Sequence, residues 1–215
     1  MKRRQFLHIS AAAIGGALVY TLDRKASLLS AETKPLSIPL HFFDEDEARI
    51  VGAAVARIFP TDELGPGADQ IGVVLYIDRQ LASAYGRDRY RYTQGPFEER
   101  ALLELGYQGK ASPRETYREA LKALSGFEQL SPAAQDEALR KIESTHFFSL
   151  LHQHTIEGMF CDPMHGGNVN MLGWQMVGFP GPRDSYTADI DKHYGVAFNP
   201  KPVSLNGNEL VEEEK

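Results

Sequence analysis

Cysteine is nearly absent from this sequence: Cys161 is the only one among 215 residues. One thiol can form no disulfide within the chain. It also cannot supply the pair of thioether bonds of a C-x-x-C-H haem attachment, or the roughly four thiolates of an iron–sulfur cluster. Covalently bound haem c and iron–sulfur centres are therefore excluded. In an exported protein, an unpaired cysteine can still pair with a cysteine of another chain.

Concentrated positive charge is also missing beyond the N-terminus. Acidic residues outnumber Lys and Arg by 29 to 23, and the formal net charge is −6. Because nucleic-acid binding requires a basic surface that neutralises phosphates, nucleic acid is not an expected partner. The glycines Gly166, Gly167 and Gly178 do not form the G-x-G-x-x-G motif, and the sequence contains no P-loop. We therefore expect no flavin, nicotinamide or nucleotide to be held by this chain.

The N-terminal stretch MKRRQFLHISAAAIGGALVYTLDRK has the pattern of a targeting segment. Residues 9–22 form a mildly apolar run that is too short to span a bilayer and typical of a signal-peptide h-region. We expect residues 1–31 to be a twin-arginine signal peptide with its linker; an uncleaved membrane anchor is the alternative. Such signals carry folded proteins, commonly because a cofactor is inserted in the cytoplasm. The residues that resemble the twin-arginine export signal are Arg3, Arg4, Phe6 and Leu7.

The rest of the sequence predicts an all-α fold: a single irregular helical domain with long ordered loops over residues 32–200, then a flexible acidic tail over 201–215. Apolar residues recur at helical spacing in FFDEDEARIVGAAVARIFP and IGVVLYIDRQLASAYG, and THFFSLLHQHTIEGMF continues as a long apolar helix. Two further helices begin with predicted capping boxes. These are formed by Ser112, Pro113 and Glu115, and by Ser131, Pro132 and Gln135.

The stretch GMFCDPMHGGNVNMLGW contains the residues most capable of chemistry. Copper favours ligands such as Cys161, Met164 and His165, and His152 and His154 lie just upstream. However, Met164 and His165 are adjacent in the chain, and two histidines two residues apart on a helix point about 200° apart. A metal site is therefore short of ligands, and a cysteine–histidine hydrolase has little specific support. A small periplasmic copper-like protein or enzyme stays open as the alternative function.

The glycines, prolines and asparagines of this stretch indicate a stiff, shaped loop instead. This loop would present Trp and Met side chains, which are favoured at the buried centres of interfaces. The alternative for Trp174 and Phe179 is that they fill the core of the domain itself. We nominate no catalytic, cofactor-binding or metal-binding residue. The predicted partner-interface residues are Cys161, Met171, Trp174, Met176 and Phe179.

Long stretches of the sequence resemble a known family. They are FPTDELGPGADQIGVVLYIDRQL, QGPF, HFFSLLHQHTIEGMF and DPMHGGNVNMLGWQMVGFPGP. They look like the small (gamma) subunit of membrane-bound gluconate 2-dehydrogenase and the related small subunits of FAD-dependent glucose, fructose and sorbitol dehydrogenase complexes. The resemblance runs from about residue 42 to about residue 194. Its most specific part is the pattern TIEG-F-DP--GGN---GW---GFPG over residues 155–181.

The resemblance implies a non-catalytic subunit. In this family the small subunit accompanies a large FAD-dependent flavoprotein of the glucose–methanol–choline oxidoreductase type, and often a multihaem cytochrome c subunit. The large subunit commonly lacks a signal of its own, so the small subunit supplies the signal for the twin-arginine translocase and helps the flavoprotein to mature. The expected location is the periplasm, at the inner membrane, as part of the complex. FAD and haem c are expected in the partners.

The sequence departs from the family pattern at Cys161 and at Met164 and His165. The family has a small residue, often serine, at the first position, and an aliphatic-aromatic pair before the glycines. In some relatives a cysteine near this position is able to bridge the two subunits. Cys161 is therefore a candidate for an intersubunit disulfide, which the oxidising periplasm permits. The alternative is a buried free thiol that behaves as a small hydrophobic residue.

Overall fold

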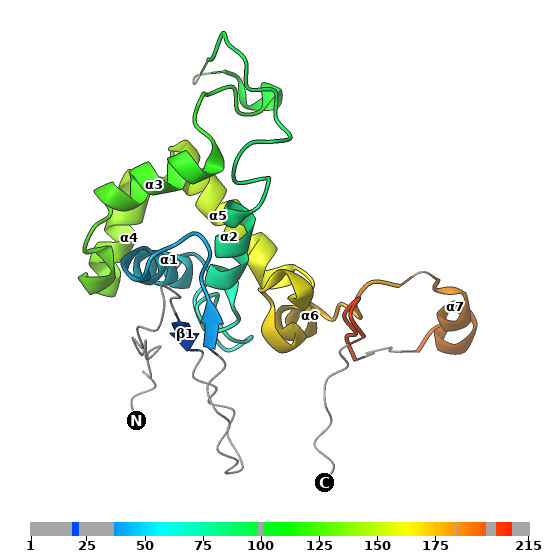
Figure 1. Ribbon diagram of the computed structural model, residues 1–215. Helices are drawn as coiled ribbons and strands as arrows, with labels where there is room; N and C mark the ends of the chain where they lie inside the picture. The colour runs from blue at the N-terminus through cyan, green and yellow to red at the C-terminus, as the bar shows by residue number, and fades with distance from the viewer. Residues whose placement is uncertain (1–18, 22–36, 99–100, 184, 197–200, 208–215) are drawn as a thin grey trace. The chain divides into compact units, whose positions relative to one another are not determined.

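The computed structural model of the chain describes residues 19–21, 37–98, 101–183, 185–196 and 201–207 (Figure 1). Most of these residues are helical, as the sequence predicts. Of the predicted signal peptide and linker, residues 1–18 and 22–31 lie outside the described residues. Strand β1 (Val19–Thr21) pairs antiparallel with β2 (Ser37–Pro39). Within the described ranges, each helix is too short or too polar to cross a membrane.

The chain forms two compact units, where the sequence predicts one helical domain over residues 32–200. Helices α1 (Glu45–Ile58) and α2 (Val73–Ala82) contribute residues to both units. Each of these helices is continuous in the sequence, so its periodicity gives no sign of the division. Unit 1 consists of Met1–Ile50 and Asp78–Ser125, and unit 2 of Val51–Ile77 and Gly126–Lys215.

Helix α1 begins with a reciprocal cap. Glu47 N donates to Asp44 Oδ1 at 2.9 Å, and Asp44 N donates to Glu47 Oε2 at 3.1 Å. These bonds satisfy two backbone groups that a helix leaves unpaired at its start. The predicted apolar faces of α1 and α2 are buried. Their buried members are Ile50, Val51, Ala54 and Val55 in α1, and Val74, Ile77 and Leu81 in α2.

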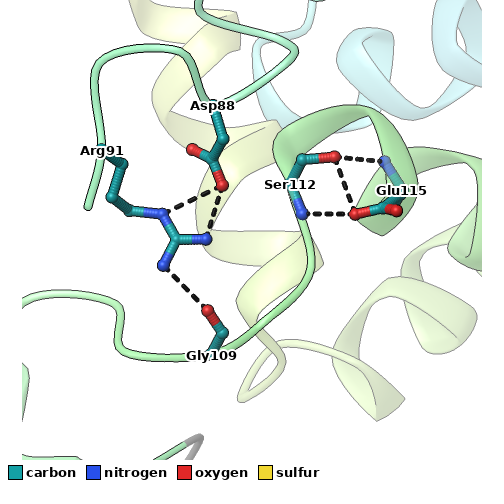
Figure 2. Close-up of polar contacts among 5 residues, drawn as sticks. All are labelled: Asp88, Arg91, Gly109, Ser112 and Glu115. Carbon is teal, nitrogen blue, oxygen red and sulfur yellow. Dashed lines mark hydrogen bonds and ion pairs between the residues drawn. The ribbon is translucent and has the colours of Figure 1, made fainter. Parts of the chain in front are cut away.

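Unit 1 also contains the 3-10 turn η1 (Leu103–Leu105) and helix α3 (Pro113–Ala123). The capping box predicted at the start of α3 is confirmed. Ser112 N donates to Glu115 Oε2 at 2.8 Å, and Glu115 N donates to Ser112 Oγ at 3.4 Å (Figure 2). The local sequence pattern therefore predicted the start of this helix correctly.

Arg91 connects two parts of the segment that precedes α3. Its Nε donates to Asp88 Oδ2 at 3.0 Å, and its Nη1 donates to Gly109 O at 2.8 Å (Figure 2). The guanidinium also lies 5.1 Å from the centre of the Tyr107 ring. We call residues 88–98 and 101–109 the tyrosine-rich loop. One arginine thus joins the two ends of this loop.

The carboxylate of Asp78, on α2, organises residues 41–43, which precede α1. It is 1% exposed. His41 N donates to its Oδ2 at 2.8 Å, and Phe42 N and Phe43 N donate to its Oδ1 at 2.8 and 2.9 Å. Three successive backbone N–H groups thus converge on one buried charge, which fixes the turn that leads into α1. Charge-assisted bonds of this kind are about twice as strong as neutral ones.

The helix that begins at Pro132, in unit 2, is capped by Ser131. Ala134 N donates to Ser131 Oγ at 3.4 Å, which confirms the predicted cap. The prediction that Gln135 completes a capping box is wrong, because the third helical position is Ala134. Gln135 is buried instead, and its Nε2 donates to Phe127 O at 3.2 Å.

The elements of unit 2 surround an apolar core. This core contains the large buried side chains Phe127, Leu139, Phe147, Leu151, Met159 and Trp174. The helices are α4 (Pro132–Lys141), α5 (His146–Phe160), α6 (Leu172–Val177) and α7 (Thr187–His193), and the 3-10 turns are η2 (Phe127–Gln129), η3 (Pro163–His165) and η4 (Val169–Met171).

We expect Asp78→Ala to lower the free energy of unfolding by about 3 kcal/mol, because it leaves buried N–H groups without an acceptor. Urea unfolding of the purified chain measures this change. Asp46→Ala is the matched control: it removes the same group from a side chain that is 81% exposed, and should cost less than about 1 kcal/mol. Equal losses in the two variants would contradict the role assigned to Asp78.

Candidate functional site

The segment that carries the family resemblance connects α5 to α6. We call residues 161–171 the GGN loop. It contains the 3-10 turns η3 and η4, and left-handed backbone at Asn168, Asn170 and Met171. Such conformations are uncommon for residues other than glycine, and they persist only where surrounding contacts enforce them.

Asn168 supplies the main contact of the GGN loop. Its side chain is fully buried. Its Nδ2 donates to Cys161 O at 2.8 Å, and its Oδ1 accepts from Gly173 N at 2.8 Å. One amide therefore satisfies a carbonyl at the end of α5 and an N–H group at the start of α6, both of which helices leave unpaired.

Two glycines permit this close approach. A Cβ at Gly173 would lie 2.0 Å from Met159 O, and a Cβ at Gly167 would lie 2.2 Å from Gly158 O. Neither position has room for a side chain against that backbone. The glycines are therefore explained by backbone-to-backbone packing, and a ligand is not needed to account for them.

The GGN loop also packs on the segment that begins α2. Val169 N donates to Ile71 O at 3.0 Å. Gly158 in α5 leaves space for Tyr76, whose hydroxyl donates to Glu157 Oε2 at 2.9 Å. The loop, α5 and residues 71–76 thus share one layer of contacts.

The predicted interface residues have different environments. Trp174 is 4% exposed, and its Nε1 donates to Phe160 O at 2.7 Å. Met171 is buried as well, and Met176 is half-buried. Phe179 is 39% exposed and meets the Trp174 ring edge-on, with centroids 5.1 Å apart. In the chain by itself, Phe179 is therefore accessible, whereas Met171 and Trp174 are buried in the core.

Cys161 is half-buried and caps the end of α5. Its thiol donates to Gly158 O at 3.7 Å. Burial raises the pKa of the thiol to about 11; a hydrogen bond from Gly167 N opposes this, and the charge of Asp162 adds to it. Because the thiolate is the nucleophile and the metal ligand, this environment does not favour either chemistry.

Two of the three histidines of α5, His152 and His154, lie in different surroundings, as their spacing predicts. His154 is 1% exposed, whereas His152 is exposed and stacks on Phe148 with centroids 6.4 Å apart. Met164 and His165 are also exposed. Among the residues that the structure describes, no group of three His, Cys, Asp or Glu side chains is placed to hold a metal ion.

His152 borders an open hollow of about 360 Å³ in unit 2. Charged groups within it pair with one another: Arg57 Nε donates to Asp136 Oδ1 at 2.6 Å and Arg57 Nη2 to Asp136 Oδ2 at 2.9 Å. The remaining lining comes from Ile58, Leu139, Arg140, Glu143 and Phe148. The bidentate pair engages two nitrogens of Arg57 and both carboxylate oxygens of Asp136. No residue of the GGN loop lines the hollow.

Asp162 joins the GGN loop to the C-terminal segment, a role that the sequence analysis does not predict. Its Oδ1 accepts from Met164 N at 3.0 Å and from Ser204 Oγ at 2.7 Å, and its Oδ2 accepts from Leu205 N at 2.9 Å. Burial opposes ionisation, but these hydrogen bonds outweigh it and lower the pKa of the carboxyl. The Asp-Pro pair predicts a turn. The bonds to Ser204 and Leu205 could not be predicted, because these residues lie more than 40 positions along the chain and leave no pattern near Asp162.

The same contacts hold part of the C-terminal segment in place. The sequence predicts a flexible tail over residues 201–215. Residues 201–207 instead pack in unit 2, where Ser204 is buried and Val203 N donates to Pro180 O at 3.1 Å. Residues 208–215, with the acidic run, lie outside the described residues.

Comparison with known protein families identifies the family of this chain. A family model described as gluconate 2-dehydrogenase subunit 3 matches residues 45–181. That range includes α1 to α6 and the whole GGN loop. Neither the curated proteins nor the solved structures contain a match to this chain.

The buried imidazole of His154 makes stability depend on pH. Burial lowers its pKa from 6.5 to about 4, while the charge of Glu157 acts in the opposite direction. Between these values the unfolded chain binds a proton that the folded chain does not. Stability should therefore fall as the pH drops through this window, by about 3 kcal/mol at its lower end.

The free energy of urea unfolding, measured across this pH range, tests the assignment. His154→Gln should remove most of the slope between pH 6.5 and about 4. His152→Gln, which changes an exposed histidine on the same helix, should retain it. A slope that follows His152 instead would refute the assignment.

Proposed function

Since the chain belongs to the gluconate 2-dehydrogenase subunit 3 family, we propose that it is a non-catalytic accessory subunit of a periplasmic, flavin-dependent sugar or polyol dehydrogenase complex. Gluconate 2-dehydrogenase is an oxidoreductase complex, and a chain of this family is an accessory subunit that associates with other subunits. The match to residues 45–181 is the observation that carries this proposal.

The environment of the reactive side chains supports a non-catalytic role. The thiol of Cys161 has a raised pKa, and the imidazole of His154 is buried and held neutral. The residues of the family pattern, Asn168 and Gly173 among them, are engaged in internal contacts. In the proposed complex, FAD is bound by the large subunit and haem c by a cytochrome c subunit.

Export is the second part of the proposal. The twin-arginine pattern at Arg3 and Arg4, with Phe6 and Leu7, addresses the chain to the twin-arginine translocase. Because this route carries folded proteins, a large subunit that has already bound FAD crosses together with this chain. The complex then resides in the periplasm at the inner membrane.

Exposed apolar residues supply surfaces for such a partner. In unit 1, Tyr90, Tyr92, Leu102 and Leu105 have exposed fractions between 63% and 84%. In unit 2, Val177 and Phe179 lie just after the buried Trp174. Obligate complexes commonly bury more than about 2,000 Å² in total, so more than one of these surfaces has to take part.

Cys161 is the candidate for a covalent link to the large subunit. Its half-buried position leaves part of the residue accessible. A thiol whose pKa is about 11 is a poor leaving group, so a disulfide formed at Cys161 in the periplasm would exchange slowly. The link would therefore persist once formed.

The export signal is tested by replacing Arg3 and Arg4 with lysine in cells that also express the large subunit. We expect dehydrogenase activity and FAD in the periplasmic fraction to fall at least about tenfold, since the translocase reads the arginine pair. Arg24→Lys is the matched control, because it also conserves charge but lies outside the pair. If the large subunit reaches the periplasm in active form without this chain, the proposed function fails.

The disulfide is tested by electrophoresis of the purified complex without reductant. The wild-type complex should give one band that contains both subunits, and Cys161→Ser should give two separate bands. Reductant should convert the first pattern into the second. Two bands from the unreduced wild type would establish Cys161 as a free thiol.

A further inference from the structure

The chain makes an excursion after α6 that begins and ends at one place. It leaves at Gly181 and returns at Val203, whose backbone is so close that a Cβ on Gly181 would lie 2.0 Å from Val203 O. Gly181 also has a positive φ of 88°, which favours glycine. We call residues 182–183, 185–196 and 201–202 the α7 arm, after the helix that it carries (Figure 1).

The base of the α7 arm is fastened to the GGN loop. Beyond the bond from Val203 N to Pro180 O, the carboxylate of Asp162 accepts hydrogen bonds from Ser204 Oγ and Leu205 N. A residue of the family pattern thus holds the point at which the arm returns. The arm itself lies beyond the matched residues 45–181, so family membership assigns no role to it.

Three exposed apolar residues form a stripe along the α7 arm. Tyr186, Ile190 and Tyr194 are 50%, 66% and 89% exposed. They are spaced four residues apart, at the cap, within the helix and at the end of α7, and residues at this spacing lie on one side of a helix. We call them the α7 stripe.

Three titratable groups of the α7 arm are paired with one another, whereas Asp191 and Lys192 are exposed to solvent. Arg183 forms an ion pair with Asp189, and its guanidinium lies 5.9 Å from the centre of the Tyr186 ring. His193 Nε2 lies 3.9 Å from the second carboxylate oxygen of Asp189. Because Arg183, Asp189 and His193 engage one another, recognition through the stripe itself would depend on apolar contact.

We propose that the α7 stripe docks in an apolar groove of the flavin-bearing large subunit, as an amphipathic helix docks through residues one turn apart. This inference rests on the proposed function, because it requires that subunit as the partner. It adds the element of the chain that makes the contact and the chemistry of the surface that receives it.

The area of the stripe favours a large subunit over a second copy of this chain. Covering two tyrosines and an isoleucine buries on the order of 400 Å², from the 150–250 Å² that an aromatic side chain buries. A stable interface needs about 800 Å² from each partner, so two stripes facing one another fall short. A large partner can also cover Val177 and Phe179, which lie shortly before the arm begins.

The test uses the full chain coexpressed with the large subunit and purified through a tag on the chain, with FAD per chain as the readout. Ile190→Asp places a charge in the centre of the stripe. We expect its Kd for the large subunit to rise roughly 10- to 100-fold, which is the effect of losing one buried aliphatic side chain. Tyr194→Ser should also raise the Kd. Tyr194 is 89% exposed, so its replacement should leave folding unchanged.

Lys192→Asp is the matched control. It adds the same residue two positions along the same helix, on the other side from the stripe, and should leave the Kd unchanged. Thermal unfolding of the three variants should match that of the wild type. Binding by the wild type should also persist in molar salt, because apolar contact is little screened.

The outcomes separate this inference from the proposed function. If the wild type retains FAD and Ile190→Asp retains it equally, or if salt releases the partner, the stripe is not the docking element. If Ile190→Asp instead converts a dimer of this chain into a monomer, the stripe binds a second copy and the inference is overturned. A wild type that retains no flavoprotein would refute the proposed function itself.

Discussion

The buried amide of Asn168 is the contact on which the rest of unit 2 depends. It bonds to Cys161 O at the end of α5 and to Gly173 N in the first turn of α6. The α6 backbone lies against Met159 because Gly173 has no side chain. The left-handed backbone of the GGN loop is maintained by this contact. Trp174 is thereby brought over the end of α5, and Asp162 is positioned to hold the returning C-terminal segment.

Unit 1 also contains a buried polar side chain that bonds to the backbone of another segment. Asp78 is surrounded by N–H donors from residues 41–43, so its charge costs little to bury and fixes where α1 begins. Both units therefore define their loops by one side chain that bonds to backbone.

This arrangement changes the meaning of the family pattern. The glycines and the asparagine of the GGN loop first attract attention as a site for chemistry, yet their contacts are internal and the reactive groups nearby have pKa values far from neutrality. The pattern describes a scaffold. Exposed apolar residues lie outside this pattern or at its end: in unit 2 at Phe179 and along the α7 stripe, and in unit 1 on the tyrosine-rich loop.

The sequence by itself determined the helical class, the caps at Ser112 and Ser131, the apolar faces of α1 and α2 and the family, because these depend on residues within a few positions of one another. Only the tertiary structure decided that the chain forms two units, that Met171 and Trp174 lie inside, and that residues 201–207 pack against Asp162. Those results depend on contacts between segments distant in the chain. Burial and the pairing of a carboxylate with a remote hydroxyl leave no periodicity in the sequence from which they could be read.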